Sequence, residues 1–480
     1  MPESTSLISD TKKRALLTNP LIFSTLVACM GSIQYGYHIA ELNAPQQSIM
    51  CPTVTMEGYE ETYLGSHGYA QCITLTDQQY GAITAMFSVG GLVGSFFGGR
   101  LANRYGRKFT SFITCTLGLV GSCVLFASNN YAGLLIGRII VGVACGVQIV
   151  VTPLYINEIT PAVWRGAMGS MNQLSINLGI LLTQSLAIKL ANELYWRWLL
   201  LVGAAIAAIN FVCWIQIYES PKWLLRHTNK LDKAENALSY LRSTTYQEVK
   251  NEINDWKKEF RHAEIESGTN VRPLTFWQYV RGASHKKPRD AITAILMGQQ
   301  FCGINSIIFY GVKIISRLLP EYAIFANFGV SIINVVVTFL ASLIVDQYGR
   351  KPLLLTSTII MSAASFFISI SIINLKSVSL IISIFVYISA FAIGLGPIPF
   401  LIIGELSTAE ESATAQSYGT VCNWLATFVI GYGFPLVNNL MGGYVYMLFA
   451  AFAISFAYYI YERVPETKSK TNYTDIWADY

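Results

Sequence analysis

Met297-Gly-Gln-Gln-Phe-Cys-Gly-Ile-Asn-Ser-Ile-Ile-Phe-Tyr310 is the stretch that decides the fold of this chain. The residues around it, 291–315, are apolar over a length that can cross a bilayer, yet three carboxamides interrupt them: Gln299, Gln300 and Asn305. An amide that has left water must find a hydrogen-bond partner, so polar side chains at membrane depth usually face the interior of a helix bundle. The stretch therefore predicts a membrane-spanning helix with a polar inner side.

The same amides suit a ligand with several hydroxyl groups, because each amide donates and accepts hydrogen bonds. On a straight helix Asn305 and Phe309 share a face, whereas the two glutamines point elsewhere. A break or bend at Gly298 or Gly303 would bring all four side chains together, as in the discontinuous helices of transporter sites. Amides that only hold neighbouring helices together are the alternative. Three amides beside two glycines favour a substrate site.

Composition places the whole chain in a membrane. Of its 480 residues, 53% are hydrophobic and 13% are charged, which excludes an ordinary soluble domain. Apolar segments of about 20 residues recur along the chain. We predict about twelve spans, over residues 21–40, 79–99, 109–127, 131–155, 167–190, 198–218, 290–313, 323–345, 353–373, 378–403, 414–438 and 443–461.

Basic residues predict which ends of the spans lie in the cytosol. Lys12, Lys13 and Arg14 precede the first span, the loop 41–79 has no Lys or Arg, and the polar gap 219–289 has many. Both termini and the gap are therefore expected in the cytosol. The net charge of +5 then reflects an asymmetry across the bilayer and gives no support to nucleic-acid binding. Polar residues before a full-length first span do not resemble a cleaved signal peptide.

Two of the nine cysteines fall in the loop that is predicted to face outward. An oxidising compartment there would permit a disulfide between Cys51 and Cys72. The other seven cysteines fall in apolar spans, where a thiol acts as a small hydrophobe. No Cys/His spacing indicates a metal site, and the sequence contains no catalytic triad or phosphate loop. We expect no metal, no cofactor and no enzymatic activity.

The N-terminal tail carries a short sorting-like motif. Glu3 stands four positions before the pair Leu7 and Ile8. This pattern resembles the acidic dileucine signals that adaptor proteins read on routes to endosomes, lysosomes or vacuoles. Sorting adaptors are therefore candidate partners.

The end of the first span carries titratable residues. Gln34, His38 and Glu41 stand on one helical face. Glu41 is expected at the outer mouth, in contact with water. His38 lies deeper, and the unperturbed pKa of histidine is near neutrality, so His38 is a candidate for proton coupling.

One charged element occurs twice, once in each half of the chain. Gly106-Arg107-Lys108 follows the second span and Gly349-Arg350-Lys351 follows the eighth, which indicates an internal repeat of six spans and a pseudo-two-fold axis. Glu158 and Glu405 mark the fourth and tenth spans in the same way. We expect these cations and carboxylates to form ion pairs that bridge the halves in one state and separate in another. Anchoring by positive-inside charge is the alternative.

These observations divide the chain into five parts. They are a cytosolic tail, a six-helix bundle, a cytosolic linker of short amphipathic helices, a second six-helix bundle and a second cytosolic tail. Their expected bounds are 1–20, 21–218, 219–289, 290–461 and 462–480.

Specific motifs spread over nearly all of residues 20–470 carry a family resemblance. They are the Gly36-Tyr37 and Asn43-Ala-Pro-Gln46 end of the first span, the two Gly-Arg-Lys loops, Gly137-Arg138, Tyr155 to Glu158, Glu219-Ser-Pro221, Gln299-Gln300, Gly394-Leu-Gly-Pro397-Ile-Pro399 and Val464-Pro-Glu466-Thr-Lys468. In these motifs the chain resembles the sugar transporter family of the major facilitator superfamily, in particular facilitative glucose transporters and their fungal relatives. The resemblance implies an all-α membrane protein with the major facilitator fold. In that fold twelve transmembrane helices form two pseudo-symmetric six-helix bundles with a cytosolic helical linker, and a central site opens alternately to each side.

The resemblance also implies site residues. Carried over position by position, the sugar contacts are Gln173, Gln299, Gln300, Asn305, Asn334, Asn423 and Trp424. Ile176 and Ile180 share the Gln173 face and would supply apolar packing, in addition to Phe309 on the Asn305 face and the aromatic wall at Phe400. The cytosolic gate would comprise Arg107, Glu158, Arg165, Glu219, Asp346, Arg350 and Glu405.

Several positions depart from the pattern of the glucose transporters. The Glu before the Gly-x-Gly-Pro motif is Ala392 here, and the Trp after its second Pro is Phe400, which keeps an aromatic wall without the indole donor. The Gln-Leu-Ser triplet of glucose-selective members is replaced by residues 296–298, and an inner-loop Arg is missing near Ser412. Glucose itself is therefore not implied.

The sequence thus predicts a carrier for a hexose-like sugar that works by alternating access around an amide-lined cleft. At His38, glucose uniporters carry Asn and proton-coupled relatives carry Asp; His gains a charge on protonation where Asp loses one, and facilitated diffusion is favoured over proton symport. A weakly transporting or non-transporting sugar sensor, or a sorting-associated protein of the same fold, is the alternative. The predicted location is a vacuolar, endosomal or plasma membrane, with the lipid bilayer and a small-molecule sugar as partners.

Overall fold

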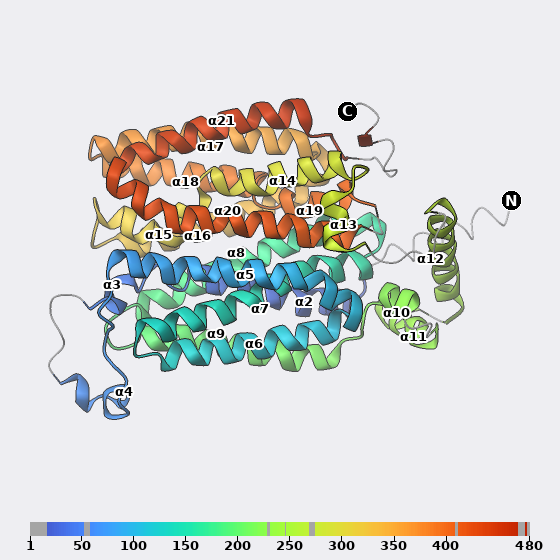
Figure 1. Cartoon of the computed structure of the whole chain (residues 1–480), viewed down its shortest axis with the longest axis horizontal. Helices are drawn as coiled ribbons and strands as arrows, with labels where there is room; N and C mark the ends of the chain where they lie inside the picture. The colour runs from blue at the N-terminus through green and yellow to red at the C-terminus, as the bar shows by residue number, and fades with distance from the viewer. Residues whose placement is uncertain are drawn as a thin grey trace.

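The computed structural model is helical throughout, apart from turns and short connections. It describes residues 17–51, 58–227, 231–244, 246–267, 274–408, 411–468 and 476–477. Two groups of long helices lie one above the other in Figure 1, and helices α10 (Pro221–His227), α11 (Leu231–Arg242) and α12 (Tyr246–Ser267) lie at one end of them. We call that end the linker end, and the other the opposite end.

The first bundle contains the long helices before the linker. They are α2 (Asn19–Ala40), α5 (Asp77–Tyr105), α6 (Arg107–Ala127), α7 (Tyr131–Ile159), α8 (Arg165–Leu190) and α9 (Trp196–Gln216). The short helices α3 (Gln46–Ile49), η1 (Tyr59–Glu61) and α4 (Tyr63–Ser66) belong to the loop between α2 and α5, and η2 (Ala162–Trp164) precedes α8.

The linker contains α10 (Pro221–His227), α11 (Leu231–Arg242), α12 (Tyr246–Ser267) and α13 (Phe276–Arg281). Its amphipathic helices bury an apolar side of their own, with Leu238, Val249 and Ile253 at the centre. The hydroxyl of Thr18, the N-cap of α2, donates to the carbonyl of Leu241 over 2.5 Å, which fixes α11 beneath the first bundle.

The second bundle repeats the arrangement, but two of its spans are broken. Its helices are α14 (Lys286–Phe301) with α15 (Ile304–Ser316), α16 (Ala323–Tyr348), α17 (Arg350–Ile373), α18 (Ser377–Ile393) with α19 (Ile398–Leu406), α20 (Ser412–Met441) and, after η3 (Gly442–Tyr444), α21 (Val445–Arg463). Each helix overlaps a span that the apolar segments predict.

Among the described residues, nine helical segments are long and apolar enough to cross a membrane. The last of these, Ser412–Arg463, contains both α20 and α21. Helices α2 and α8 have the length, 22 and 26 residues, but several of their buried side chains are amides or hydroxyls, which lowers their hydropathy. With α2 and α8 included and α20 and α21 counted separately, the described chain has twelve spans, six on each side of the linker.

Candidate functional site

The central stretch of the sequence forms a broken helix. Helix α14 ends at Phe301 and α15 begins at Ile304, and Gly303 between them has φ 99°, a left-handed conformation that favours glycine. A Cβ atom on Gly303 would lie 2.5 Å from the ring of Phe449. Gly298, the other candidate for the break, lies inside α14 and packs against Phe456. The helix therefore breaks at Gly303 and not at Gly298.

The three amides around this break form one hydrogen-bonded chain. Asn305 Nδ2 donates to Gln300 Oε1 over 2.5 Å, and Gln300 Nε2 donates to Gln299 Oε1 over 3.1 Å. From α20, Asn423 Nδ2 donates to the same Gln299 oxygen over 2.8 Å, and the hydroxyl of Thr427 accepts from Asn305 over 3.3 Å. All four amide side chains are buried. The break brings together residues that a straight helix would separate.

A second helix break supplies the partner of Gln299. Helix α18 ends at Ile393 and α19 begins at Ile398, and Gln299 Nε2 donates to the carbonyl of Leu395 between them over 2.7 Å. A Cβ atom on Gly394 would lie 2.3 Å from the carbonyl oxygen of Leu353, which explains the glycine there. Gln299 therefore holds α14 to the α18–α19 break and to α20, the helix-joining role that amides can also play.

A second set of amides joins the two bundles. Gln173 Nε2 on α8 donates to Asn177 Oδ1 over 3.1 Å. Asn177 Nδ2 then donates across the interface to Asn334 Oδ1 over 3.1 Å and to the hydroxyl of Thr338 over 2.7 Å, both on α16. Asn177 and Thr338 were not among the residues predicted from the sequence. Asn177 stands one turn after Gln173, and that spacing is the signal that could have identified it.

Both amide sets retain polar atoms that could bind a ligand. Within the described chain, Asn305 Oδ1, Asn423 Oδ1, Gln173 Oε1 and Asn334 Nδ2 take part in no hydrogen bond. Three of these atoms are acceptors and one is a donor, so the set can satisfy hydroxyl groups of either orientation.

The apolar residues predicted for the site lie in one continuous cluster. Ile176 and Ile180 from α8, Phe309 from α15, Phe400 from α19 and Trp424 from α20 all belong to a cluster of buried side chains that both bundles supply. The candidate site therefore combines apolar surface with a few polar amide groups, a combination that is typical of small-molecule sites.

Trp424 reaches from the second bundle into the first. Its ring lies edge-on to Tyr35 at 5.5 Å and to Phe87 at 5.3 Å between centroids. A Cβ atom on Gly91 of α5 would lie 2.4 Å from the indole. The indole Nε1 is buried and takes part in no hydrogen bond within the described chain. It is a donor that a ligand could satisfy.

The titratable residues at the end of α2 form a buried cluster. Glu41 Oε1 accepts from Arg138 Nη1 over 2.8 Å, and Glu41 Oε2 lies 3.0 Å from His38 Nδ1. All three side chains are fully buried, and the Arg138 guanidinium stacks over Phe87. The expectation that Glu41 lies in water at the outer mouth is wrong, because Arg138 of α7 draws the carboxylate into the bundle. Gln34, one turn before His38, is also buried.

The predicted gating residues form a repeated pattern at the linker end. Arg107 pairs with Glu158 at 2.7 Å in the first bundle, and Arg350 pairs with Glu405 at 2.7 Å in the second. In this structure each pair therefore lies inside one bundle and does not bridge the two.

Two further glutamates complete the repeat. Glu219 accepts from the backbone N–H groups of Arg107 and Lys108 over 2.9 and 3.0 Å, at the start of α6. Glu466 accepts from Arg350 and Lys351 over 3.0 Å each, at the start of α17. Each carboxylate caps a helix whose N-cap is a glycine that cannot do so. Glu466 was not assigned a role from the sequence.

Burial raises the pKa of the Glu219 carboxyl. Loss of water raises the pKa of its carboxyl above the ordinary 4.5, although the backbone N–H groups and Arg107 act in the opposite direction.

Some predicted residues lie outside what the structure describes. Glu3, Leu7 and Ile8 precede the first described residue, and the side chains of Arg165 and Asp346 are likewise not described.

At the opposite end, Asn43 holds the bundles together. Its Nδ2 donates to the carbonyl of Ile308 over 2.8 Å, and its Oδ1 accepts from the N–H of Val312 over 3.2 Å. Asp77 and Lys313 form an exposed ion pair across the same interface at 2.9 Å. These contacts join the two bundles at the opposite end.

The loop beyond Asn43 contains a disulfide. Cys51 and Cys72 are bonded, with their Cα atoms 4.9 Å apart. Among the described residues no group of three or more His, Cys, Asp or Glu side chains is arranged to hold a metal ion.

Comparison with known proteins gives one consistent relationship. Residues 24–474 match the family described as "Sugar (and other) transporter". The chain is 57% identical to "Probable metabolite transport protein YBR241C" of Saccharomyces cerevisiae, over 97% of each protein. It is 46% identical to "Vacuolar protein sorting-associated protein 73" of the same yeast, over 97% of this chain and 98% of the relative. It is 31% identical to the human "Solute carrier family 2, facilitated glucose transporter member 4", over 95% of this chain and 90% of the relative.

Solved structures agree on the fold. A structure of the proton:xylose symporter XylE, bound to 6-bromo-6-deoxy-D-glucose, has a TM-score of 0.78 to this chain at 22% identity, over 95% of this chain and 98% of the symporter. The major facilitator fold expected from the sequence is confirmed.

Proposed function

Because this chain belongs to the sugar transporter family of the major facilitator superfamily, we propose that it carries a hexose-like sugar across a membrane by alternating access. The chain is an integral, multi-pass membrane protein. The observation that carries the proposal is the pair of amide sets, one around the break at Gly303 and one between α8 and α16. Their unused polar atoms can replace the hydration that a sugar loses when it enters the bundle.

We assign binding to residues of both bundles. Gln300, Asn305 and Asn423 would contact sugar hydroxyls from one bundle and Gln173 from the other, with Trp424 stacked against the ring. Gln299 would orient the neighbouring amides of Gln300 and Asn423, because its own amide already bonds Leu395 and Asn423. Ile176, Ile180, Phe309, Phe400 and Asn334 would complete the lining.

Alternating access would use the contacts at the two ends. The opposite end is held by Asn43 and by the Asp77–Lys313 pair, which must release for the site to open there. At the linker end, the gating residues Arg107, Glu158, Glu219, Arg350 and Glu405 would keep each bundle rigid while it rotates. The breaks at Gly303 and at residues 394–397 would let half-helices tilt separately.

Facilitated diffusion is the transport mode that the buried cluster supports. Glu41 already pairs with Arg138, so protonating the glutamate would leave the arginine charge buried without a counter-ion. Proton coupling through His38 is the second candidate, because His38 contacts the same carboxylate. Sugar-evoked proton entry into liposomes, lost in His38→Ala, would establish coupling.

The transport proposal is tested by uptake of labelled hexoses into liposomes that contain the purified protein. A panel of hexoses, pentoses and polyols identifies the substrate. We expect Gln300→Ala to lose most uptake while Gln78→Ala, an exposed amide on α5, keeps it. Background uptake in the wild type with every solute would reject transport in favour of a receptor or sorting role.

That second role has one specific support, the name of the 46% identical yeast relative, "Vacuolar protein sorting-associated protein 73". A sorting-associated protein would keep the fold and bind adaptors without appreciable flux. The two roles are distinguished in host cells from which the gene for this chain is deleted. The cells are complemented with the Gln300→Ala variant, and the sorting of a vacuolar marker is measured. Full rescue of sorting by a transport-dead variant would support the second role.

We further propose that the linker end faces the cytosol and that the membrane is vacuolar. The basic residues of the linker support the first statement, and the name of the same yeast relative supports the second. The bounds 1–20, 21–218, 219–289, 290–461 and 462–480 then describe tail, bundle, linker, bundle and tail. Fluorescence microscopy with Leu7→Ala and Ile8→Ala tests whether the N-terminal motif directs this location.

A further inference from the structure

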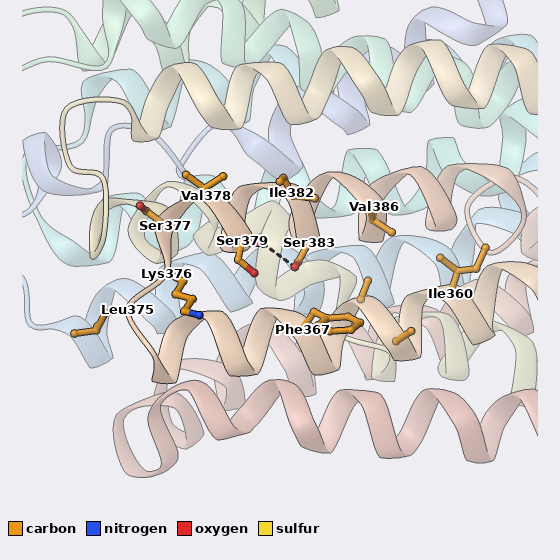
Figure 2. A pocket seen from close by; sticks show the side chains of 12 residues that line it. Ile360, Phe367, Leu375, Lys376, Ser377, Val378, Ser379, Ile382, Ser383 and Val386 are labelled. Atoms are coloured by element: carbon orange, nitrogen blue, oxygen red, sulfur yellow. Dashed lines mark hydrogen bonds between the residues drawn. The ribbon is translucent and has the colours of Figure 1, made fainter.

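A groove with a volume of about 810 Å³ runs between α17 and α18 on the outside of the second bundle (Figure 2). Its walls are large apolar side chains, among which Phe367, Val378 and Ile382 are 55%, 72% and 58% exposed. Ala364 and Ser383 are small and buried, so they form the floor of the groove between the larger side chains. Both helices are membrane-spanning, so this groove faces lipid tails.

Two of the serines that line the groove, Ser379 and Ser383, form hydrogen bonds within the protein. Ser383 donates to the carbonyl of Ser379 over 2.7 Å, and the hydroxyls of Ser379 and Ser371 lie 2.7 Å apart. Their polar atoms are satisfied within the protein, so the groove presents mainly carbon to its surroundings.

One end of the groove is electropositive. Lys376 is exposed there as the N-cap of α18, and within the described chain its ammonium group makes no hydrogen bond or ion pair. The first N–H groups of α18 have no side-chain cap, and the Ser377 hydroxyl stands beside them. A lysine, a helix N-terminus and a hydroxyl together suit a phosphate.

The turn before α18 fixes this arrangement. Leu375 has φ 53°, a left-handed conformation that is unusual for leucine, and Lys376 N donates to the carbonyl of Ser371 over 2.9 Å. The turn leaves the side chain of Leu375 74% exposed beside Lys376.

We propose that this groove binds one glycerophospholipid from the leaflet at the opposite end. One acyl chain would lie between α17 and α18, and the phosphate would bind Lys376 and the first turn of α18. Charge complementarity selects this occupant, because a sterol or a neighbouring apolar helix carries no anion to bind the exposed lysine and the helix N-terminus. The inference depends only on the membrane location and not on the solute that is carried.

The test measures lipid binding to the purified full chain in detergent by native mass spectrometry. The probes are dioleoyl-phosphatidylglycerol and dioleoylglycerol, which has the same chains without phosphate. We expect Lys376→Ala to weaken phosphatidylglycerol binding about fivefold, because one lysine is lost near the headgroup. Ala363→Trp, which fills the groove from an exposed position, should weaken it by a similar factor or more.

Matched variants control for surface charge and bulk. Lys189→Ala removes an exposed lysine from the last turn of α8, which lies at the opposite end as Lys376 does. Ala451→Trp adds an indole to an exposed position of α21. Both should bind phosphatidylglycerol as the wild type does. Equal binding by Lys376→Ala and the wild type overturns the proposal, as does equal binding of the phosphate-free lipid. Loss in Lys376→Ala with full binding in Ala363→Trp also overturns it, because the lipid would then not occupy the groove.

Discussion

Asn305 and Gln300 form a hydrogen bond of 2.5 Å across the broken seventh span, between the first turn of α15 and the last turn of α14. The bond exists because Gly303 turns the chain between them. The amides of the candidate site therefore depend on a backbone conformation as much as on their own side chains.

Gly303→Ala should destabilise the protein. The left-handed φ and the contact with Phe449 each oppose a Cβ atom, and together we expect a cost of about 1–3 kcal/mol. Thermal unfolding of the purified protein in detergent measures this. Gly433→Ala is the control, because its Cβ would meet no atom within 4 Å. A Gly303→Ala midpoint as high as that of Gly433→Ala would contradict the argument.

Gly91→Ala should impair the site through Trp424. A Cβ 2.4 Å from the indole forces the ring to move, and we expect an overpacking cost of about 1–3 kcal/mol that appears as weaker sugar uptake. Uptake into liposomes is the measurement. Gly81→Ala, whose Cβ would have its nearest neighbour at 3.9 Å, should be tolerated. If both variants transport alike, Trp424 does not line the site.

Asn43→Ala should favour the state that is open at the opposite end. Two hydrogen bonds between the bundles are lost, each worth about 1 kcal/mol. A cysteine introduced by Val312→Cys should then react with an impermeant thiol reagent at least about fivefold faster. Lys313→Ala removes only an exposed ion pair, worth about 0–1 kcal/mol, and should accelerate labelling less. The reverse order would show that the ion pair, not Asn43, holds this end closed.

Glu466→Ala should destabilise the second bundle by about 1 kcal/mol. The change removes the acceptor for two backbone N–H groups at the start of α17, which Gly349 cannot replace. Thermal unfolding is again the measurement, with the exposed Glu462→Ala on α21 as the control. Identical midpoints for the two variants would mean that water caps the helix equally well.

Glu219 should make stability depend on pH. Its pKa is raised in the folded chain, so the folded state holds this proton more tightly than the unfolded state does. Its contribution is therefore full below the unfolded pKa and is lost as pH rises through the folded pKa. The unfolding midpoint of the wild type minus that of Glu219→Gln should fall as pH rises from about 4 upward. If the midpoint of the wild type minus that of Glu219→Gln rises with pH instead, the pKa of Glu219 is lowered in the folded chain and the argument is wrong.

Local pattern was enough to predict much of the molecule. The twelve apolar segments predict the spans to within a few residues, because length and hydropathy are properties of one helix at a time. The glycine-flanked amides predicted a broken helix, and the repeated Gly-Arg-Lys loops predicted two related bundles. Each of these inferences depends on neighbours in sequence.

The errors concern partners that are distant in sequence. The sequence places Glu41 in water, because the pattern of its own helix does not indicate a contact with Arg138, which lies three spans later along the chain. Asn43 was recognised as part of a motif, but its partners lie on α15. Glu466 could have been identified from the internal repeat, since it follows the last span as Glu219 follows the sixth.

The two capping glutamates have a consequence for how the chain could be divided. Each bundle contains its own arginine, its own glutamate partner and its own cap, so neither needs the other to complete its linker end. Two separate polypeptides, cut between α12 and α13 and produced in the same cell, should therefore each fold and reassemble into a working whole.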